Sequence, residues 1–382
     1  MTGTSRPRLV LAVELDGAGR HPAAWRLPAA RPHELFTAAH WRRLAATVDE
    51  ADLDFLTLPD SFHLASGDDG EQRGRLDAVA TAAHLAPLTR RTGLVPVITT
   101  THTEPFHTSK ALATLDFTSL GRAGWQVEVS TTSEEALAFG RRAVETTDAL
   151  WREAGESVQV VRALWDSWED DAIVRDLATG RYVDVEKLHH IDFVGSTFSV
   201  KGPSITPRSP QGQPPVVVPV RDAPSRALAA AHADVARIEA PDEATALASV
   251  RALRAEAGAR PLIVLVDVEV ALRAHAAEAR AVRTELDDLA PRHDPRSLRQ
   301  VGNPASLTAF LRALTEQDAG VDGVVLVPLD LPVSLDLVAA EVLPALRAQG
   351  LRPPVRVRGR GPAPTLRDRL GLNRPASVYA GA

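Results

Sequence analysis

Short apolar runs alternate along the whole chain with longer stretches in which apolar residues recur every three or four positions. The short runs are rich in β-branched residues and bounded by Pro, Gly or charge, which is typical of buried parallel strands. Residues 41–51 and 307–314 show the helical period of 3.6. The expected strands are Leu9–Val13, Phe55–Leu58, Leu94–Ile98, Gly124–Val129, Val216–Val220, Val235–Ile238, Leu262–Val268 and Gly323–Val327. Strands separated by helices in this order predict an α/β fold, a (β/α)8 TIM barrel.

Three segments depart from a minimal barrel, although the pattern favours a single domain over residues 1–382. A polar stretch with Gly and Pro, residues 168–214, reads as an insertion after the fourth βα unit. Between Val270 and Asn303 the pattern predicts only one charged helix, roughly Arg273 to Leu289. Residues 352–382 form a C-terminal tail.

Composition narrows the function classes. The formal net charge of −6 argues against a nucleic-acid binder, and the single basic run, Arg356 to Arg360, is better interpreted as a solvated arm. The absence of cysteine excludes disulfides and thiol catalysis. The apolar run before Glu14 is too short for a signal peptide or a membrane span, so we expect a cytoplasmic protein. No dinucleotide, P-loop or serine-hydrolase motif is present.

Two segments carry a family resemblance. The run LDFTSLGRAGWQVEVS (Leu115 to Ser130) reads as a helix end, a tight turn and a buried strand. With LWDSWEDDAIVRDLATGRYVD (Leu164 to Asp184) and TLRDRLGL (Thr365 to Leu372), it resembles the luciferase-like flavin monooxygenases. The most similar branch acts on nitrilotriacetate, EDTA, dibenzothiophene sulfone and long-chain alkanes. In that branch the excursion corresponding to residues 270–303 is longer and helps to cover the substrate.

The resemblance implies site residues at the carboxyl ends of the strands. His21 matches a family His that faces flavin and substrate, which makes it the catalytic candidate. It could equally be a structural cap or a solvated side chain. Asp60 matches an acidic residue near the flavin ring, but a carboxylate at a strand end is also a common helix N-cap.

The third and fourth strands add further flavin candidates. Thr99 and Thr100 match a Ser/Thr pair that can donate to the isoalloxazine carbonyls, unless they merely favour the strand. Gln126 keeps the amide of a family Asn on a longer stem. Glu128 brings a carboxylate to an apolar family position, so we expect it to be paired or to face the mouth of the barrel.

At the phosphate end the sequence departs from the family. Trp151 replaces a Tyr that helps to hold FMN phosphate. The family's glycine-and-serine phosphate loop is aligned with Val218 to Asp222, so Asp222 stands where a hydroxyl should be. An anion about 4 Å from a phosphate costs roughly 4 kcal/mol at an intermediate dielectric. Asp222 also suits the N-cap of a helix that starts near Pro224.

Three neighbours offer compensation at that end. Arg221 and Arg226 would offset the charge of Asp222 by turning inward, and Ser225 would supply a displaced hydroxyl. Whether the phosphate site is rebuilt or lost therefore depends on where these side chains point.

The resemblance implies an FMN-dependent monooxygenase acting on a small organic substrate with molecular oxygen. A separate NAD(P)H-dependent flavin reductase would supply the reduced FMN, and a homo-oligomer is expected. The alternative is a degenerate barrel that binds flavin weakly or not at all and serves as a non-catalytic structural or regulatory partner. Neither reading involves a nucleic acid, a membrane or a metal.

Overall fold

A computed structural model describes residues 8–64, 70–290, 295–316, 320–353, 355 and 363–379. The basic run Arg356 to Arg360 lies outside these residues. Among the described helices, none combines the length and the apolarity that crossing a membrane requires.

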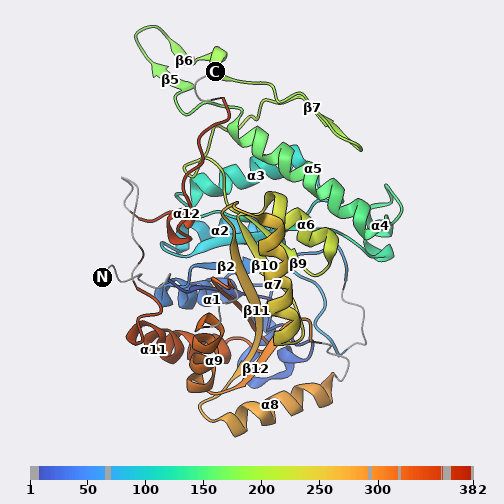
Figure 1. Cartoon of the computed structure of the whole chain (residues 1–382), viewed down its shortest axis with the longest axis vertical. Coiled ribbons are helices and arrows are strands. Elements are labelled where there is room, and N and C mark those ends of the chain that lie inside the picture. Colours follow the sequence, from blue (N-terminus) through green and yellow to red (C-terminus); the bar gives the residue numbers. More distant parts are fainter. Residues whose placement is uncertain are drawn as a thin grey trace.

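Eight parallel strands close into a barrel (Figure 1). Each strand pairs with the next along the chain, and β13 returns to β1 with Val10 opposite Gly323. Pairing of Val235 with Ile263 joins β10 to β11 and completes the ring. The barrel strands are β1 (Val10–Glu14), β2 (Phe55–Leu58), β3 (Gly93–Thr99), β4 (Trp125–Glu128), β9 (Val216–Val220), β10 (Val235–Ile238), β11 (Ile263–Leu272) and β13 (Gly323–Pro328).

Helices surround the barrel, as the apolar periodicity predicts. Their apolar faces pack against the outward-facing side chains of the strands and form the larger of the molecule's apolar clusters. The helices are α1 (Ala38–Ala51), α2 (Ala78–Leu85), α3 (Pro105–Thr118), α4 (Ser133–Phe139), α5 (Thr147–Asp166), α6 (Ala223–His232), α7 (Glu243–Ala257), α8 (Ala276–Leu289), α9 (Pro304–Glu316), α10 (Val333–Leu337), α11 (Leu343–Ala348) and α12 (Leu366–Arg369). The predicted fold class is confirmed.

Five strands lie outside the predicted set. Two hairpins, β5 (Ile173–Asp176) with β6 (Arg181–Val183) and β7 (Phe193–Val194) with β8 (Ser199–Val200), lie in the segment between α5 and β9. Figure 1 shows the β5–β6 hairpin at one end of the molecule and α8 at the other.

The fifth is β12 (Leu298–Gly302), which pairs only with the far end of β11. Its sequence, LRQVG, contains no continuous apolar run, and three of its five residues are partly exposed. A strand of mixed polar and apolar residues that is only partly buried gives no clear period, so the sequence pattern missed it.

The lower part of the barrel interior is apolar. Inward-facing side chains such as Ala12, Val95 and Leu265 form a second apolar cluster, which also includes Leu366 and Leu370 of the α12 segment. The segment therefore closes the base of the barrel. Leu366 packs so closely on β3 that a Cβ atom added at Gly93 would lie 2.6 Å from it.

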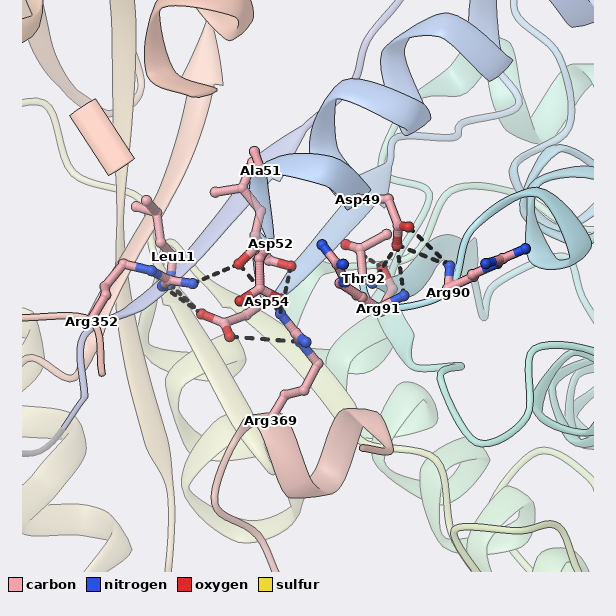
Figure 2. Close-up of polar contacts among 12 residues, drawn as sticks. Leu11, Asp49, Ala51, Asp52, Asp54, Arg90, Arg91, Thr92, Arg352 and Arg369 are labelled. Atoms are coloured by element: carbon pink, nitrogen blue, oxygen red, sulfur yellow. Dashed lines mark hydrogen bonds and ion pairs between the residues drawn. The ribbon is translucent and has the colours of Figure 1, made fainter. Parts of the chain in front are cut away.

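Buried ion pairs tie the tail to the base (Figure 2). Asp54, which is fully buried, accepts hydrogen bonds from the Leu11 amide at 2.8 Å and from Arg352 at 2.8 Å. Arg369 of α12 donates to the Asp52 carboxylate at 2.5 Å. Burial opposes the charge of Asp54, but Arg352 and Arg8 hold its pKa below the usual range. The base is thus locked by charges from both ends of the chain.

A second aspartate organises the loop before β3. Asp49, near the end of α1, accepts amide hydrogen bonds from Arg90, Arg91 and Thr92 at 2.7 to 3.0 Å (Figure 2). These contacts satisfy backbone donors that the turn into β3 would otherwise leave without partners.

Candidate active site at the barrel mouth

A cavity of about 500 Å³ opens at the carboxyl ends of the strands, where barrel enzymes carry their sites. The strand ends β1, β2, β4, β9 and β10 supply most of its wall, and α5 and the segment before β12 contribute side chains from outside the barrel. Among the described lining residues, seven are acidic and four are arginines. They are Glu14, Asp16, Asp60, Glu128, Glu135, Asp222 and Glu239, with Arg20, Arg75, Arg221 and Arg296. The mouth is therefore polar and carries an excess of negative charge.

Arg237 occupies the centre of the barrel directly below this cavity. It points inward from β10 with 1% of its side chain exposed, and it donates to Asp267 of β11 at 2.6 Å and 3.1 Å. Its other donors reach Glu14 of β1 at 2.9 Å and the amide oxygen of Gln126 at 2.6 Å. One planar guanidinium thus joins β1, β4, β10 and β11, which a point-charge ammonium could not do.

The carboxylates around Arg237 differ in their proton affinity. Burial disfavours the charge of Glu14, but Arg20 and Arg237 bring its pKa below the usual value. For Asp267 burial outweighs the attraction of Arg237, and the pKa is raised. The network therefore contains one carboxylate that is firmly ionised and one that takes up a proton more readily.

A second ion cluster forms one wall of the mouth. Arg221, just after β9, donates two hydrogen bonds to Glu128 at 2.8 Å and 2.9 Å and one to Glu239 at 2.9 Å. Although burial disfavours the charge of Glu239, Arg221 holds its pKa at about 2. Glu128 was expected either to be paired or to face the mouth, and it does both. The charge of Arg221 is already matched by two carboxylates.

The residues predicted to contact flavin occupy different settings. The amide oxygen of Gln126 accepts hydrogen bonds from Arg237 and, at 3.3 Å, from Thr57. Both bonds hold this oxygen inside the barrel. Thr100 donates its hydroxyl to the Glu128 carbonyl at 3.2 Å. Thr99 is 3% exposed, and its hydroxyl has no hydrogen-bond partner among the described residues. Thr99 follows Val97, a lining residue, on the same face of β3, so it points toward the mouth.

His21 lies beside the mouth and is not among its described lining residues. Its side chain is buried, Nδ1 accepts from the Ala23 amide at 3.2 Å, and Nε2 lies 3.5 Å from Asp287 of α8. Its neighbour Arg20 reaches the wall instead. These contacts agree with the alternative interpretation of His21 as a structural residue of the loop after β1.

Asp60 lines the mouth and also serves the start of α2. Its carboxylate accepts the amides of Ser61 at 2.8 Å and Ala78 at 2.9 Å, whereas the N-cap of α2 is Asp77. Burial raises the pKa of Asp60. Both readings of this residue therefore have a structural basis, because it faces the cavity and binds the first amide of the helix.

At the predicted phosphate end, Asp222 is the N-cap of α6, as its sequence context predicts. Ser225 is fully buried in the same cap, with its hydroxyl 2.6 Å from the Asp222 carboxylate. Arg226 does not turn inward, because it pairs with Glu256 of α7 at 2.7 Å. Trp151 of α5 is 4% exposed and lines the mouth. Neither Arg226 nor Ser225 is therefore among the described lining residues of the mouth, where it would offset the charge of Asp222.

An aromatic cluster lies at the rim. His102 stacks on Phe139 with their ring centroids 4.4 Å apart, and Phe62 packs edge-on against Phe139 at 4.6 Å. Phe62 lies between the lining residues Ser61 and His63, so this cluster borders the opening. It gives an otherwise charged entrance one apolar side.

The inner ion network was missed by sequence reasoning. Arg237 of β10 and Asp267 of β11 each stand between apolar neighbours on their strand, and Glu239 follows Arg237 by two residues, just past the end of β10. This spacing places Arg237 and Glu239 on the same, inward face. That alternation was a usable signal, because a charged residue inside an apolar strand must find a partner. Which strands supply the partners depends on barrel closure and could not be read from one strand alone.

Fold and site together define a (β/α)8 barrel protein with its candidate site at the carboxyl ends of the strands. Residues 18–319 match the luciferase-like monooxygenase family, which covers well over half of the chain. The chain belongs to this family.

Individual relatives agree with that assignment. The chain is 36% identical over 232 residues to the N-acetyl-S-(2-succino)cysteine monooxygenase of Bacillus subtilis (strain 168), covering 61% of this chain and 53% of that protein. It is 38% identical over 231 residues to nitrilotriacetate monooxygenase component A of Aminobacter aminovorans, covering 57% and 51%. The matched region thus spans about half the length of these curated relatives. Among solved structures, riboflavin lyase with modified FMN and riboflavin superposes with a TM-score of 0.85 at 27% identity, covering 97% of both chains.

Proposed function

We propose that this protein is a flavin-dependent monooxygenase that oxidises a small organic substrate with molecular oxygen. A separate NAD(P)H-dependent flavin reductase would supply the reduced flavin, and the enzyme would act in the cytoplasm as a homo-oligomer. The observation that carries the proposal is an open cavity at the catalytic end of a barrel whose family and relatives are named as monooxygenases. The non-catalytic alternative is not proposed, because the two curated relatives described above are both monooxygenases.

The ring end of the mouth suits a flavin. Thr99 holds a buried hydroxyl without a partner among the described residues, which is costly unless a ligand accepts its hydrogen bond. A carbonyl at the edge of an isoalloxazine ring is such an acceptor. Bound flavin would supply the oxygen chemistry itself.

The phosphate of FMN does not fit the residues present. The place expected to hold it carries the Asp222 carboxylate, a buried Ser225 hydroxyl and an arginine already paired with two glutamates.

The chain's own residues would orient the substrate and handle protons. Asp60 faces the cavity, and its raised pKa lets it retain a proton to a higher pH than a solvated aspartate. This makes Asp60 a better-placed proton donor than the buried His21. The aromatic cluster of Phe62, His102 and Phe139 would admit the apolar part of an organic substrate.

The test is oxygen incorporation with the full chain. Purified protein, a flavin reductase, NADH, flavin and 18O2 would be combined with candidate sulfur- and nitrogen-bearing substrates and alkanes. Transfer of one 18O atom to a substrate, with consumption that depends on the protein, would support the proposal. Oxygen uptake that yields only peroxide across the whole panel, and no change in flavin spectrum on adding protein, would refute it.

A further inference from the structure

We infer that the mouth of this barrel discriminates against a terminal phosphate, so that the flavin it uses is phosphate-free, of the riboflavin type, instead of FMN. The inference rests on the proposed flavin-dependent function and specifies the ligand of that same site. Three features of the wall at α6 and β9 carry it: the amides of the helix, the hydroxyl of its cap and the charge of its arginine.

Three of the first four positions of α6, residues 224 to 226, offer no free amide to a phosphate. A helix N-terminus binds phosphate through N–H groups that lack partners inside the helix. Here the Ser225 amide donates to the Asp222 carboxylate at 2.8 Å, the Arg226 amide donates to the Asp222 carbonyl at 3.1 Å, and residue 224 is a proline with no N–H. The Asp222 carboxylate occupies the position that a phosphate oxygen would need.

The cap also removes the nearest hydroxyl. The Ser225 oxygen accepts the amides of Arg221 and Asp222, both at 3.1 Å, and donates back to Asp222. With no exposed surface, this side chain cannot turn toward the cavity without breaking the capping box. A phosphate would therefore gain no hydroxyl donor from α6.

The positive charges at this end of the cavity are also neutralised by carboxylates of the protein. Arg221 is clamped between Glu128 and Glu239, each within 2.9 Å, and Arg226 is held by Glu256 on α7. A phosphate would have to displace a glutamate from Arg221 and remain beside the charge of Asp222. Among anions, a phosphate ester is disfavoured most because it carries up to two negative charges.

The same wall suits a ligand that ends in a hydroxyl. Glu128, Glu239 and Asp222 all line the cavity, and as carboxylates they only accept hydrogen bonds. The ribityl chain of riboflavin ends in a hydroxyl, which donates to such acceptors, whereas a phosphate ester ionised at neutral pH offers little to donate. Charge and hydrogen-bond polarity thus favour the same ligand.

The experiment compares riboflavin with FMN on the full-length protein. Each flavin would be titrated in its oxidised form by fluorescence quenching and in its dithionite-reduced form under anaerobic conditions, at low and high salt. We expect riboflavin to bind at least tenfold more tightly than FMN at low salt. The difference should shrink as salt rises, because screening weakens the repulsion of the phosphate.

Two matched variants locate the effect. Asp222→Asn keeps an equally good N-cap while removing the charge, and should tighten FMN binding at least threefold, so that the preference for riboflavin over FMN falls by at least the same factor. Asp242→Asn makes the same change in the N-cap of α7, where the carboxylate accepts the Thr245 amide at 2.9 Å outside the described mouth lining. It should alter neither affinity.

The outcomes separate the two claims. If FMN binds as tightly as riboflavin or more tightly, for example with its phosphate beside Arg75 or Arg296, the inference is overturned and the proposed function stands. If neither flavin binds in either redox state, the proposed function fails and takes the inference with it. Should Asp222→Asn not fold, the flavin preference of the unmodified protein and its salt dependence still decide.

Discussion

At the scale of single residues, Arg237 stands out because its charged side chain is buried inside the barrel. It lies where the apolar filling of the barrel ends and the polar mouth begins, with Glu14 and Asp267 as buried partners. A buried ion pair adds little net stability compared with a well-packed apolar group, but removal of one partner leaves a buried charge uncompensated. Removing Arg237 should therefore lower the free energy of unfolding by more than the small net contribution of its ion pairs.

Arg237→Leu should therefore lower the free energy of unfolding by about 3–5 kcal/mol, since two carboxylates lose their shared counter-charge. Urea denaturation followed by circular dichroism would measure the change. The matched control is Arg312→Leu, which breaks an exposed pair with Glu316 at 2.9 Å and should cost less than about 1 kcal/mol. Equal, small effects of both substitutions would contradict the buried network.

Thr99→Val tests the hydroxyl that has no partner among the described residues. Because the variant loses no internal hydrogen bond, its stability should be unchanged or higher, while its affinity for reduced flavin should fall roughly 3- to 10-fold. Thr100→Val should behave in the opposite way, because that hydroxyl is bonded to the Glu128 carbonyl. Calorimetric melting and anaerobic flavin titration give the two readouts. A loss of stability in Thr99→Val with intact flavin affinity would exclude the proposed contact.

At the scale of elements, the segment between α5 and β9 is joined to the tail by charge. Arg208, whose side chain is 1% exposed, binds Asp166 at the end of α5, the Asp170 carboxylate and the Pro375 carbonyl. Arg374 donates to the same Asp170 carboxylate at 2.5 Å and 2.8 Å. The hairpin-bearing segment and the tail thus meet at one aspartate.

Asp170 gives this junction a pH dependence. Hydrogen bonds from Arg374 and Arg208 lower its pKa from 3.8 to about 2, so its contribution is present above pH 4 and is lost as the pH falls toward 2. Asp170 is largely exposed, and screening limits the effect to less than about 1 kcal/mol. The melting temperature of Asp170→Asn should therefore be slightly below that of the unmodified protein at pH 7, and the gap should close near pH 2. A gap that stays constant over this range would rule out the ion pair as its cause.

The barrel strands were predictable from sequence because each is a continuous apolar run with both faces buried, as in Val216–Val220. The cap formed by Asp222 was also predictable, since it depends on residues within one turn. The partners of Arg221 and Arg237 were not, because they come from strands far apart in the chain. The surroundings of His21 were not predictable either, because its side chain lies 3.5 Å from Asp287 of α8, far along the chain.

At the scale of the whole molecule, stability and chemistry occupy opposite ends of the barrel. The base joins the start of β1 to the segment after α11, since the Leu9 amide donates to the Leu351 carbonyl at 2.9 Å and Arg352 donates to the Leu9 carbonyl at 2.8 Å. Leu366 then fills the interior from below. Changes at the base should affect folding and leave the mouth intact.

Leu366→Ala should lower the free energy of unfolding by about 2–5 kcal/mol, because it leaves a cavity at the base of the barrel. Leu372→Ala, in the same tail but only partly buried, should cost clearly less. Flavin affinity measured under folding conditions should be unchanged in both variants. If Leu366→Ala altered flavin affinity and left stability intact, the two ends of the barrel would not be independent.

Strand β11 continues past its pairing with β10, which ends at Val266, and along that same edge it pairs with β12 from Val268 opposite Leu298 to Leu272 opposite Gly302. Its other edge stays paired with β13 as far as Val270. The excursion that carries α8 therefore leaves from the end of the barrel strand β11 and returns on its neighbour β12, which is not one of the eight barrel strands. Lengthening such a loop adds little closure entropy, about 0.6 kcal/mol for each doubling. We therefore expect that the segment between β11 and β12 can be replaced by one of another length or composition with little effect on the barrel strands. Insertion of a new segment after β11 would then be a way to change which substrates reach the mouth of the barrel.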